Sequence, residues 1–224
     1  MNNTPALWTI VTPTMGRPTI LDLKERLKQE TVPYVHLVMM DSKRAEDSLD
    51  PQDIEDERTF VYDIRHPLYP KPDARMDVYL RGIGILMART PYIRCCDDDV
   101  WPEPDHLRKV TDFMEKNKLD FTWCLRRMYT REREKIGIDG FEAIGITNQF
   151  GYNLLDNSSL FYNQKAAMIL SQVFLTNPVY GDDRLTWGPL HQYCKGDFMP
   201  EVLTNHMAQP HLNDFFKKFC TPEE

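Results

Sequence analysis

Leu7-Trp8-Thr9-Ile10-Val11-Thr12 is an apolar, β-branched run near the start of the chain. Such a run predicts a strand that is buried on both faces, as the strands of parallel sheets are. A loop over 13–18 comes next, and then a helical pattern for which Thr19 is a candidate cap. A second apolar run, Tyr34 to Met40, completes a strand–helix–strand unit. The sequence therefore predicts an α/β fold with a mixed, mainly parallel sheet and helices on both faces.

Alternating apolar runs and helical spacings continue along the chain. The leucines that indicate the first helix are Leu21, Leu23 and Leu27. Further strands are predicted over Phe60 to Ile64, Asp120 to Cys124, Asn157 to Tyr162 and Lys195 to Leu203. Helices are predicted over Asp77 to Met87 (core positions Val78, Ile85 and Leu86), Asp105 to Lys118 (Leu107, Val110 and Phe113), Gln164 to Phe174 and Phe215 to Phe219. Gly137 to Phe150 contains three glycines and is expected to be a mobile loop.

Composition narrows the class of protein. The 224 residues suffice for a single domain, 1–224, with a real core, since 42% are hydrophobic and 11% aromatic. The formal net charge of -7 argues against a general nucleic-acid binder. No apolar run reaches membrane-spanning length, and the N-terminus lacks a basic region followed by an apolar core. The five cysteines show no paired metal-type spacing, so we expect a cytoplasmic protein with reduced thiols.

Three consecutive carboxylates, Asp97-Asp98-Asp99, come after a short apolar run and precede Val100-Trp101-Pro102. Side chains alternate at a strand end, so Asp97 and Asp99 are expected to point the same way. Two carboxylates on one side form an oxygen site for Mg²⁺ or Mn²⁺, with phosphates filling other positions. The alternative is an acidic turn with no ligand.

The ends of the first two predicted strands are the other candidate binding positions. Ligands of open α/β sheets lie at the carboxyl ends of strands, which is where Thr12 to Thr14 and Asp41 fall. Asp41 could instead be a turn-forming residue. Arg75 and Arg81 flank the helix predicted over Asp77 to Met87, where they could reach a diphosphate or remain solvated.

Several of these stretches together resemble GT-A fold glycosyltransferases of the family 2 type. Trp8 to Thr14 followed by Gly16-Arg17-Pro18 is similar to the opening strand and loop of that fold. Arg81-Gly82-Ile83 ahead of the Asp cluster is similar to the run before its Asp-x-Asp motif, and Val100-Trp101-Pro102 is similar to the run after it. The resemblance is best over about 7–110. Aligned on Trp101, the first Asp of the motif could fall on Cys96, so the metal pair is either Asp97 with Asp99 or Asp99 with Asp98.

The resemblance implies a nucleoside-diphosphate sugar as donor, a UDP-sugar first, and Mn²⁺ or Mg²⁺ between the Asp cluster and the diphosphate. The implied metal ligands are Asp97, Asp99 and a C-terminal histidine, His206 rather than His211. The implied donor contacts are Thr12, Pro13, Thr14, Arg17, Asp41, Arg75, Arg81 and Asp98. The donor half would be about 1–110 and the acceptor half about 111–224.

The second half offers a candidate base and a basic segment. Asp182 and Asp183 open a predicted helix, where inverting GT-A enzymes carry an acidic pair that supplies the general base. Asp183 is the first choice, and Asp182 is second or a helix cap. Arg126 to Lys135 has five basic residues and an aromatic, Tyr129, near Trp123. This segment predicts a groove for an anionic acceptor such as nucleic acid, or else a solvated edge strand.

The sequence thus predicts a metal-dependent hexosyl- or pentosyltransferase that acts on the hydroxyl of a saccharide or of a modified nucleic-acid base. Two alternatives use the same residues. One is a nucleotidyltransferase or nucleotide hydrolase with the same carboxylate and metal chemistry. The other is a non-catalytic nucleotide-binding module.

Overall fold

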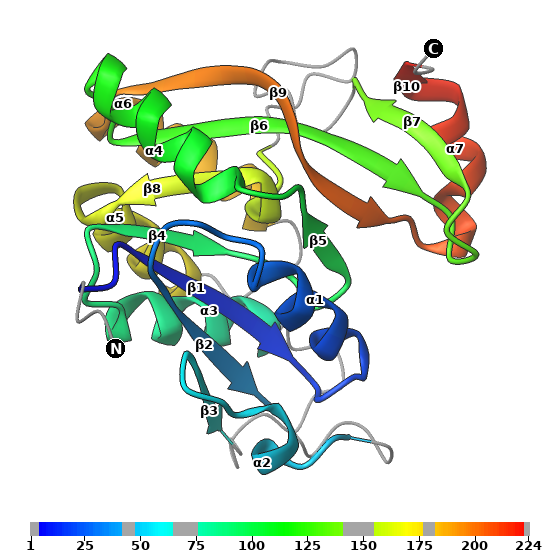
Figure 1. Ribbon diagram of the computed structural model, residues 1–224. Helices are drawn as coiled ribbons and strands as arrows, with labels where there is room; N and C mark the ends of the chain where they lie inside the picture. The colour runs from blue at the N-terminus through cyan, green and yellow to red at the C-terminus, as the bar shows by residue number, and fades with distance from the viewer. Residues whose placement is uncertain (1–4, 42–47, 65–75, 141–154, 177–181, 222–224) are drawn as a thin grey trace.

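The computed structural model describes residues 5–41, 48–64, 76–140, 155–176 and 182–221, and it shows a mixed sheet with helices on both sides (Figure 1). The strands are β1 Trp8–Thr14, β2 Tyr34–Met40, β3 Thr59–Asp63, β4 Tyr92–Cys95, β5 Val100–Pro102, β6 Phe121–Tyr129, β7 Lys135–Asp139, β8 Leu160–Asn163, β9 Gly196–Met207 and β10 Cys220–Thr221. The helices are α1 Thr19–Leu27, α2 Pro51–Ile54, α3 Met76–Met87, α4 His106–Asn117, α5 Gln164–Thr176, α6 Asp182–Tyr193 and α7 Asn213–Phe219, with short 3-10 turns η2 Asn157–Ser159 and η3 Pro210–Leu212. None of the helices in these ranges combines the length and the apolar character that a bilayer span requires.

The parallel half of the sheet sets the edge at which a ligand can bind. Strand β1 lies between β2 and β4, parallel to both, and β3 continues the parallel run beyond β2. In register, Thr14 lies opposite Met40, and Val11 lies opposite Cys95. The carboxyl ends of these strands therefore meet at one edge of the sheet. The predicted α/β fold is confirmed.

The remaining strands extend the sheet with antiparallel pairs. Strand β8 lies between β4 and β6 and is antiparallel to both. The long strand β9 pairs with β6 in parallel along its length. Near its end, β9 also pairs with the short β5, which comes directly after the Asp cluster. The pairing with β5 brings the end of β9 to the ligand edge, as Figure 1 shows.

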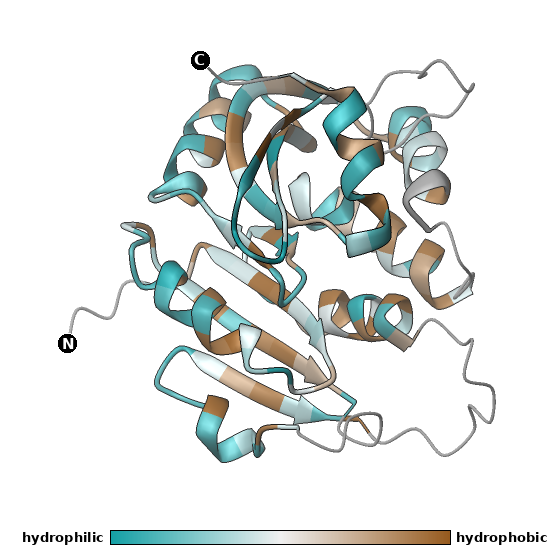
Figure 2. Ribbon diagram, turned by 90° about the vertical axis from the view of Figure 1, so that its right-hand side faces the viewer, coloured by the Kyte–Doolittle hydropathy of each residue, from teal (hydrophilic) through white to brown (hydrophobic). Residues whose placement is uncertain are grey.

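The two faces of β1 pack into two separate cores. Trp8 and Ile10 pack with the inner sides of α1 and α4, whereas Val11 packs with α3 and α5. Strands buried in this way are apolar on both faces, which is why the runs at 7–12 and 34–40 are almost wholly hydrophobic. In Figure 2, brown apolar stretches follow the strands, and teal polar residues cover much of the helices.

Some predicted core positions and boundaries differ from the structure. The buried positions of α1 are Ile20, Leu23 and Leu27, which are spaced by three and four residues, and Leu21 is 38% exposed. Leu86 is likewise exposed, since it lies one position past the buried Ile85. In α4 the fully buried residue after Val110 is Met114, and Phe113 is only partly buried.

Boundary predictions also changed. Thr19 is the first residue of α1 rather than its cap, which is Pro18 without a side-chain hydrogen bond. Strand β6 continues to Tyr129, well past the predicted end at Cys124. Gly137 belongs to β7 rather than to a loop, because β7 pairs with both β6 and β10. Residues 141–150 of that predicted loop lie outside the described ranges.

Arg94, in the middle of β4, is fully buried and joins several elements. Its guanidinium contacts His106 Nε2 and donates a hydrogen bond of 2.8 Å to the Ser158 carbonyl. His106 Nδ1 in turn lies 2.5 Å from Glu30 Oε1. The Glu30 carboxylate also accepts backbone N–H groups at the start of α4, at 3.2 and 3.0 Å. One buried polar network thus holds together strand β4, helix α4, turn η2 and the segment that follows α1.

Two buried histidines make stability depend on pH. Burial, with help from nearby Lys24, lowers the pKa of His36 from 6.5 to about 3. Burial and the nearby charge of Arg94 lower the pKa of His106 from 6.5 to about 4. Below pH 6.5 the unfolded chain binds protons at these positions and the folded chain does not, so the free energy of unfolding falls as the pH falls.

We predict that His36→Leu reduces this pH dependence by roughly 1 kcal/mol per pH unit between pH 6 and pH 5. The measurement is urea unfolding at several pH values. The variant also loses the hydrogen bond of 2.9 Å between His36 Nε2 and Thr12 Oγ1, so the slope and not the absolute stability is the test. His211→Leu, at an exposed position, is the matched control and should leave the slope unchanged. An unchanged slope in His36→Leu would contradict the assignment.

Candidate active site

A cavity of about 310 Å³ lies at the carboxyl edge of the parallel strands. Its lining comes from the loop after β1, from the end of β2, from the first turns of α3, from the Asp cluster and from the end of β9. These residues are Pro13, Thr14, Met15, Arg17, Asp41, Met76, Asp77, Leu80, Arg81, Asp97, Asp98, Asp99, His206 and Gln209. Most of the predicted donor and metal residues therefore line one cavity.

The loop after β1 turns sharply at Gly16. The φ of Gly16 is 84°, a left-handed conformation that favours glycine, so the turn itself accounts for the glycine at this position. The Gly16 N–H donates to Thr14 Oγ1 at 3.0 Å and closes the turn. This turn places Arg17 beside the Asp cluster.

Asp98 is the most deeply held carboxylate of the cluster. Its side chain is fully buried, and it accepts hydrogen bonds from Thr14 Oγ1 and from Arg17, whose Nε lies 3.0 Å away. Burial raises the pKa of the Asp98 carboxyl, although the two donors oppose this. Asp98 therefore ties the loop after β1 to the Asp cluster.

Asp97 is held by Arg81, which projects from α3. Arg81 Nη2 lies 2.5 Å from Asp97 Oδ1, and its Nη1 lies 3.3 Å from Asp77 Oδ2. Burial opposes ionisation of Asp97, but Arg81, and secondarily His206, hold its pKa below the ordinary value. The Asp97 N–H also donates to Ser158 Oγ at 3.2 Å, so the turn η2 supports the cluster from behind.

Asp99 makes the weakest contact of the three. Its side chain is 17% exposed, and Oδ2 lies 3.7 Å from Arg17 Nη2. Strand β4 ends at Cys95 and a turn lies at 98–99, so strand alternation is not what orients Asp97 and Asp99. Cys96, the other position considered for the first motif residue, is buried in the core, where burial raises the pKa of its thiol to about 12. Cys96 therefore does not face the cavity.

His206 reaches the cavity from the other half of the chain. It lies opposite Val100 where β9 pairs with β5, and its Nδ1 is 3.4 Å from Arg126 Nη1. His211, the alternative, lies on the exposed turn η3 and is not among the residues that line the cavity. The structure thus favours His206 as the histidine nearest the Asp cluster.

The donor set at the cavity fits Mg²⁺ or Mn²⁺ in its chemistry. Carboxylate oxygens suit both ions, and imidazole is an accepted ligand of Mn²⁺-type sites. Within the described ranges, however, no three His, Cys, Asp or Glu side chains are already gathered around one point suitable for a metal ion. An ion here would be held by Asp97, Asp99 and His206 after the carboxylates loosen their contacts with Arg81 and Arg17.

The other predicted site residues fall elsewhere or cannot be placed. Thr12 is fully buried, and its hydroxyl is hydrogen-bonded to His36 rather than turned to the cavity. Arg75 lies outside the described residues. Helix α6 begins at Asp182, which puts Asp183 in its first turn as expected, but the described part of the chain does not include their side chains.

The basic segment for which a groove was predicted begins at Arg126 in β6. Arg126 is 4% exposed and is paired with Asp139 at 2.8 Å and with Asp156 at 3.1 Å. Arg127 Nη1 lies 2.6 Å from Glu103 Oε1. Carboxylates from other elements occupy both side chains, so a role of Arg126 and Arg127 in steering an anionic acceptor stays a prediction.

Two residues near the site were missed by sequence reasoning. Asp156 is partly buried beside Arg126 and accepts a hydrogen bond of 2.8 Å from Ser159 Oγ. Burial disfavours its charge, but Arg126 and His206 hold its pKa below the ordinary value. Ser158 supports Asp97 through its hydroxyl. The sequence feature that could have pointed to Asp156 and Ser158 was the polar start of the run that leads into β8.

Comparisons with known proteins agree with this geometry. The family model described as glycosyl transferase family 2 matches residues 79–176, which include α3, the Asp cluster and α5. No protein of curated function matches the sequence at a significant level.

Solved structures with a similar fold include S. aureus TarS 1-349 in complex with UDP-GlcNAc, with a TM-score of 0.62 and 13% identity over 90% of this chain and 58% of that chain. Another is S. aureus TarS 1-349 in complex with UDP, with a TM-score of 0.60 and 12% identity over 94% of this chain and 62% of that chain. The chain spans less than two thirds of the length of these structures. The fold comparison confirms the expected GT-A fold, and the family match supports the resemblance to family 2 glycosyltransferases.

Proposed function

We propose that this protein transfers a sugar, of hexosyl or pentosyl type, from a nucleoside-diphosphate sugar to the hydroxyl of an acceptor. The observation that carries the proposal is the cavity in which two arginines, five aspartates and a histidine meet at the carboxyl edge of a GT-A sheet. A UDP-sugar is the first donor to test, because the similar TarS structures are described as complexes with UDP and UDP-GlcNAc.

Donor binding is assigned to the first half of the chain, about 1–110. Asp41 comes after β2 at the edge of the cavity, where its carboxylate can accept hydrogen bonds from the base or ribose. Arg17 and Arg81 stand on either side of the Asp cluster, and guanidinium groups bind phosphates through paired N–H donors. Pro13 and Thr14 contribute the wall between them.

The leaving diphosphate needs its charge balanced as the bond to the sugar breaks. A divalent ion bound to Asp97, Asp99 and His206 would supply that charge. Arg17, with a side chain 41% exposed, can turn from Asp98 and Asp99 to a phosphate. Asp98 remains the anchor of the loop that carries Arg17.

Acceptor activation is assigned to the second half, about 111–224. A carboxylate in the first turn of α6 would take the proton of the acceptor hydroxyl as the new bond forms. Asp183 is the proposed base, and Asp182 is second. The pairing of β9 with β5 brings residues of the second half next to the Asp cluster.

Asp99→Ala is the test of the metal and donor site. We expect it to abolish Mn²⁺-dependent binding of UDP while the fold is retained, because Asp99 makes only the long contact with Arg17. Calorimetry with UDP and Mn²⁺ measures the affinity, and circular dichroism checks the fold. Asp112→Ala, at an exposed position on α4, is the matched control. Unchanged affinity in Asp99→Ala would remove the proposed donor site.

Asp183→Asn is the test of the proposed base. We expect transfer to slow by roughly a hundredfold or more, with UDP and Mn²⁺ binding retained. The measurement is mass-spectrometric detection of product over a panel of UDP-sugars and acceptors. Wild-type turnover in Asp183→Asn would exclude this residue as the base. Release of UMP and a sugar 1-phosphate instead of UDP would point to a nucleotide hydrolase, and release of pyrophosphate from UTP would point to a nucleotidyltransferase.

A further inference from the structure

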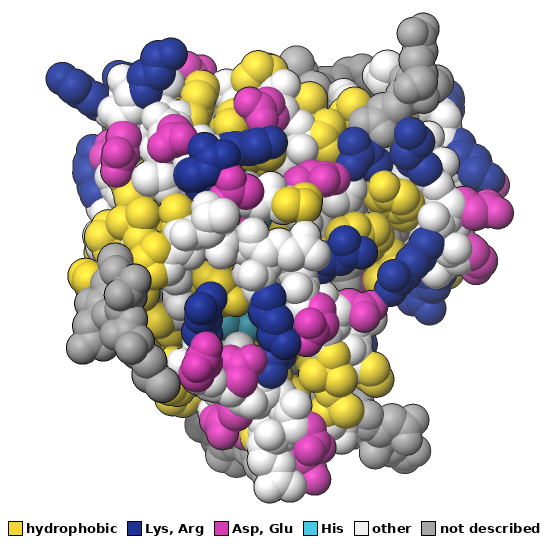
Figure 3. All heavy atoms as spheres, viewed as in Figure 1, with side chains coloured by type: hydrophobic (Ala, Val, Ile, Leu, Met, Phe, Trp, Pro, Cys, Tyr) yellow, Lys and Arg dark blue, Asp and Glu magenta, His cyan; other side chains and the backbone are white. Residues whose placement is uncertain are grey.

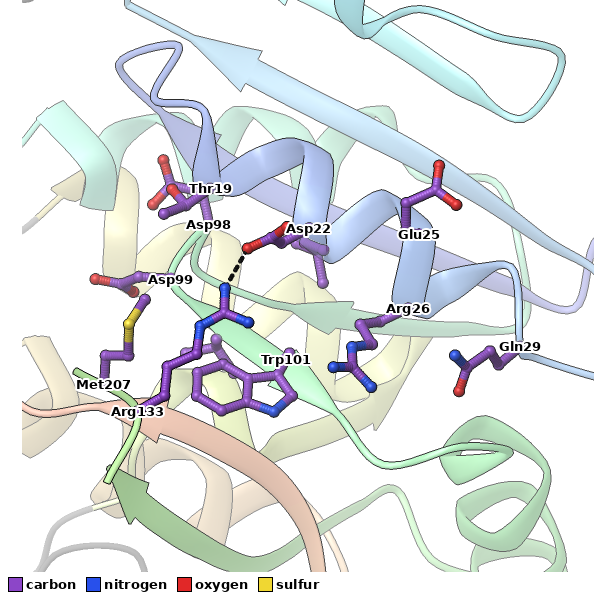
Figure 4. A pocket seen from close by; sticks show the side chains of 12 residues that line it. Thr19, Asp22, Glu25, Arg26, Gln29, Asp98, Asp99, Trp101, Arg133 and Met207 are labelled. Carbon is purple, nitrogen blue, oxygen red and sulfur yellow. Dashed lines mark hydrogen bonds and ion pairs between the residues drawn. The ribbon is translucent and has the colours of Figure 1, made fainter. Parts of the chain in front are cut away.

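A second cavity of about 360 Å³ lies on the other side of the Asp cluster, against α1 (Figure 4). It is lined by residues of α1, of β5, of the turn between β6 and β7, and of the end of β9. These residues are Thr19, Asp22, Leu23, Glu25, Arg26, Gln29, Asp98, Asp99, Val100, Trp101, Arg133 and Met207. Because Asp98 and Asp99 line both cavities, a ligand in the second cavity would adjoin a donor in the first.

The floor of the second cavity is aromatic and its wall is polar. Trp101, in β5, is partly exposed, and its ring lies 5.1 Å from the ring of Tyr129, which backs it. The wall is the outward face of α1, where Asp22 and Arg26 lie four residues apart, and Gln29 follows after the helix ends at Leu27. Figure 4 shows Asp22 and Arg26 on the side of α1 where Trp101 lies.

Arg133 closes one end of the cavity. It has a φ of 64° in the turn between β6 and β7, and its Nη2 donates to Asp22 Oδ2 at 2.6 Å. Its guanidinium carbon lies 6.0 Å from the centre of the Trp101 ring. Arg133 and Asp22 are 60% and 63% exposed, and such surface pairs contribute at most about 1 kcal/mol, so a ligand can open this contact at small cost.

The charge of the cavity disfavours an anionic ligand. Its lining has four carboxylates, Asp22, Glu25, Asp98 and Asp99, and two guanidinium groups, Arg26 and Arg133. Arg133 is already paired with Asp22. On the face seen in Figure 3, Lys and Arg side chains stand beside Asp and Glu rather than in one basic patch. A phosphate backbone would therefore meet repulsion here.

We propose that the second cavity binds the acceptor of the transfer reaction, and that this acceptor is an uncharged or amino-bearing saccharide whose ring lies on Trp101. The face of a sugar ring carries C–H groups that pack on an aromatic ring, while its hydroxyls need donors and acceptors around the rim. Trp101 supplies the first, and Asp22, Arg26 and Gln29 supply the second. The volume of the cavity suits a sugar unit of one or two rings. This inference rests on the proposed function, because it places the acceptor in the cavity that adjoins the donor.

The experiment measures donor and acceptor binding separately on the full chain. Binding of UDP with Mn²⁺ is measured by calorimetry. Binding to immobilised neutral and amino oligosaccharides, to heparin and to a single-stranded DNA 20-mer is measured on an array in the presence of UDP. The wild type should bind a neutral saccharide with little dependence on salt, since no phosphate contacts are made. Binding of a positively charged amino saccharide should weaken as salt screens the carboxylates. The wild type should bind neither polyanion specifically.

Trp101→Ala should weaken saccharide binding by tenfold or more, and by far more than any change in UDP affinity, since it removes the aromatic surface on which the sugar ring packs. Trp101→Phe keeps an aromatic ring and should restore much of the binding. It also keeps the proposal testable if the alanine variant fails to fold. Tyr193→Ala removes an exposed aromatic far along α6 and is the matched control that should change neither measurement.

Three results would overturn the proposal: no saccharide bound, preferential and salt-sensitive binding of heparin or DNA, or saccharide binding unaffected by Trp101→Ala. Absence of UDP binding in the wild type would instead contradict the proposed function. The two failures can be told apart, because calorimetry reports on the donor cavity and the array reports on the second cavity.

Discussion

The buried guanidinium of Arg94 is the constraint on which the arrangement of the site depends. A charge removed from water is costly unless it is paired and hydrogen-bonded, and Arg94 finds its hydrogen-bond partners in two separate elements, α4 and η2. It lies three residues before Asp97, and it holds the carbonyl of Ser158, whose hydroxyl accepts the Asp97 N–H. Through this chain of contacts the position of the Asp cluster is fixed by the packing of α4 and η2 against β4. The Glu30 carboxylate completes the network by pairing with His106 and by satisfying N–H groups at the start of α4.

Three adjacent carboxylates repel one another, and the two arginines at the cavity counter that repulsion. Arg81 binds Asp97 from α3, and Arg17 binds Asp98 from the loop after β1. In the proposed reaction these charges exchange partners. The diphosphate would bind the arginines while a divalent ion binds the carboxylates, so that the net charge of the site changes little. Such an exchange explains how a cluster of like charges can be stable before the donor arrives and still bind both ion and nucleotide.

The sequence was informative where burial imposes a repeating pattern. The parallel strands β1 and β2 and the helices α3, α4 and α5 were predicted because an element buried on one or both faces must be apolar there. The end of each strand then located Asp41 and the Asp cluster. The sequence was uninformative where long-range pairing decides the outcome. Arg126 and Arg127 look like solvent-facing cations, but carboxylates distant in sequence allow both to lie within a central strand.

The same limit applies to the Asp cluster and its surroundings. Three identical side chains in a row do not reveal that Asp98 is buried against Thr14 and Arg17 while Asp99 faces the cavity. The partial exposure of Trp101 beside Arg133 depends on the β6–β7 turn folding back onto α1, over a separation of 111 residues between Arg133 and Asp22. Hydropathy and spacing carry no information on such contacts.

The central claim is that the cavity between the loop after β1, helix α3 and the end of β9 holds a nucleoside diphosphate. A crystal structure of the protein grown with UDP and Mn²⁺ tests it most directly. The account predicts the uracil and ribose beside Asp41 and the diphosphate between Arg17 and Arg81, with the ion against Asp97 and Asp99. UDP bound at another place on the protein, with Arg17 and Arg81 still paired to Asp98 and Asp97, would contradict it.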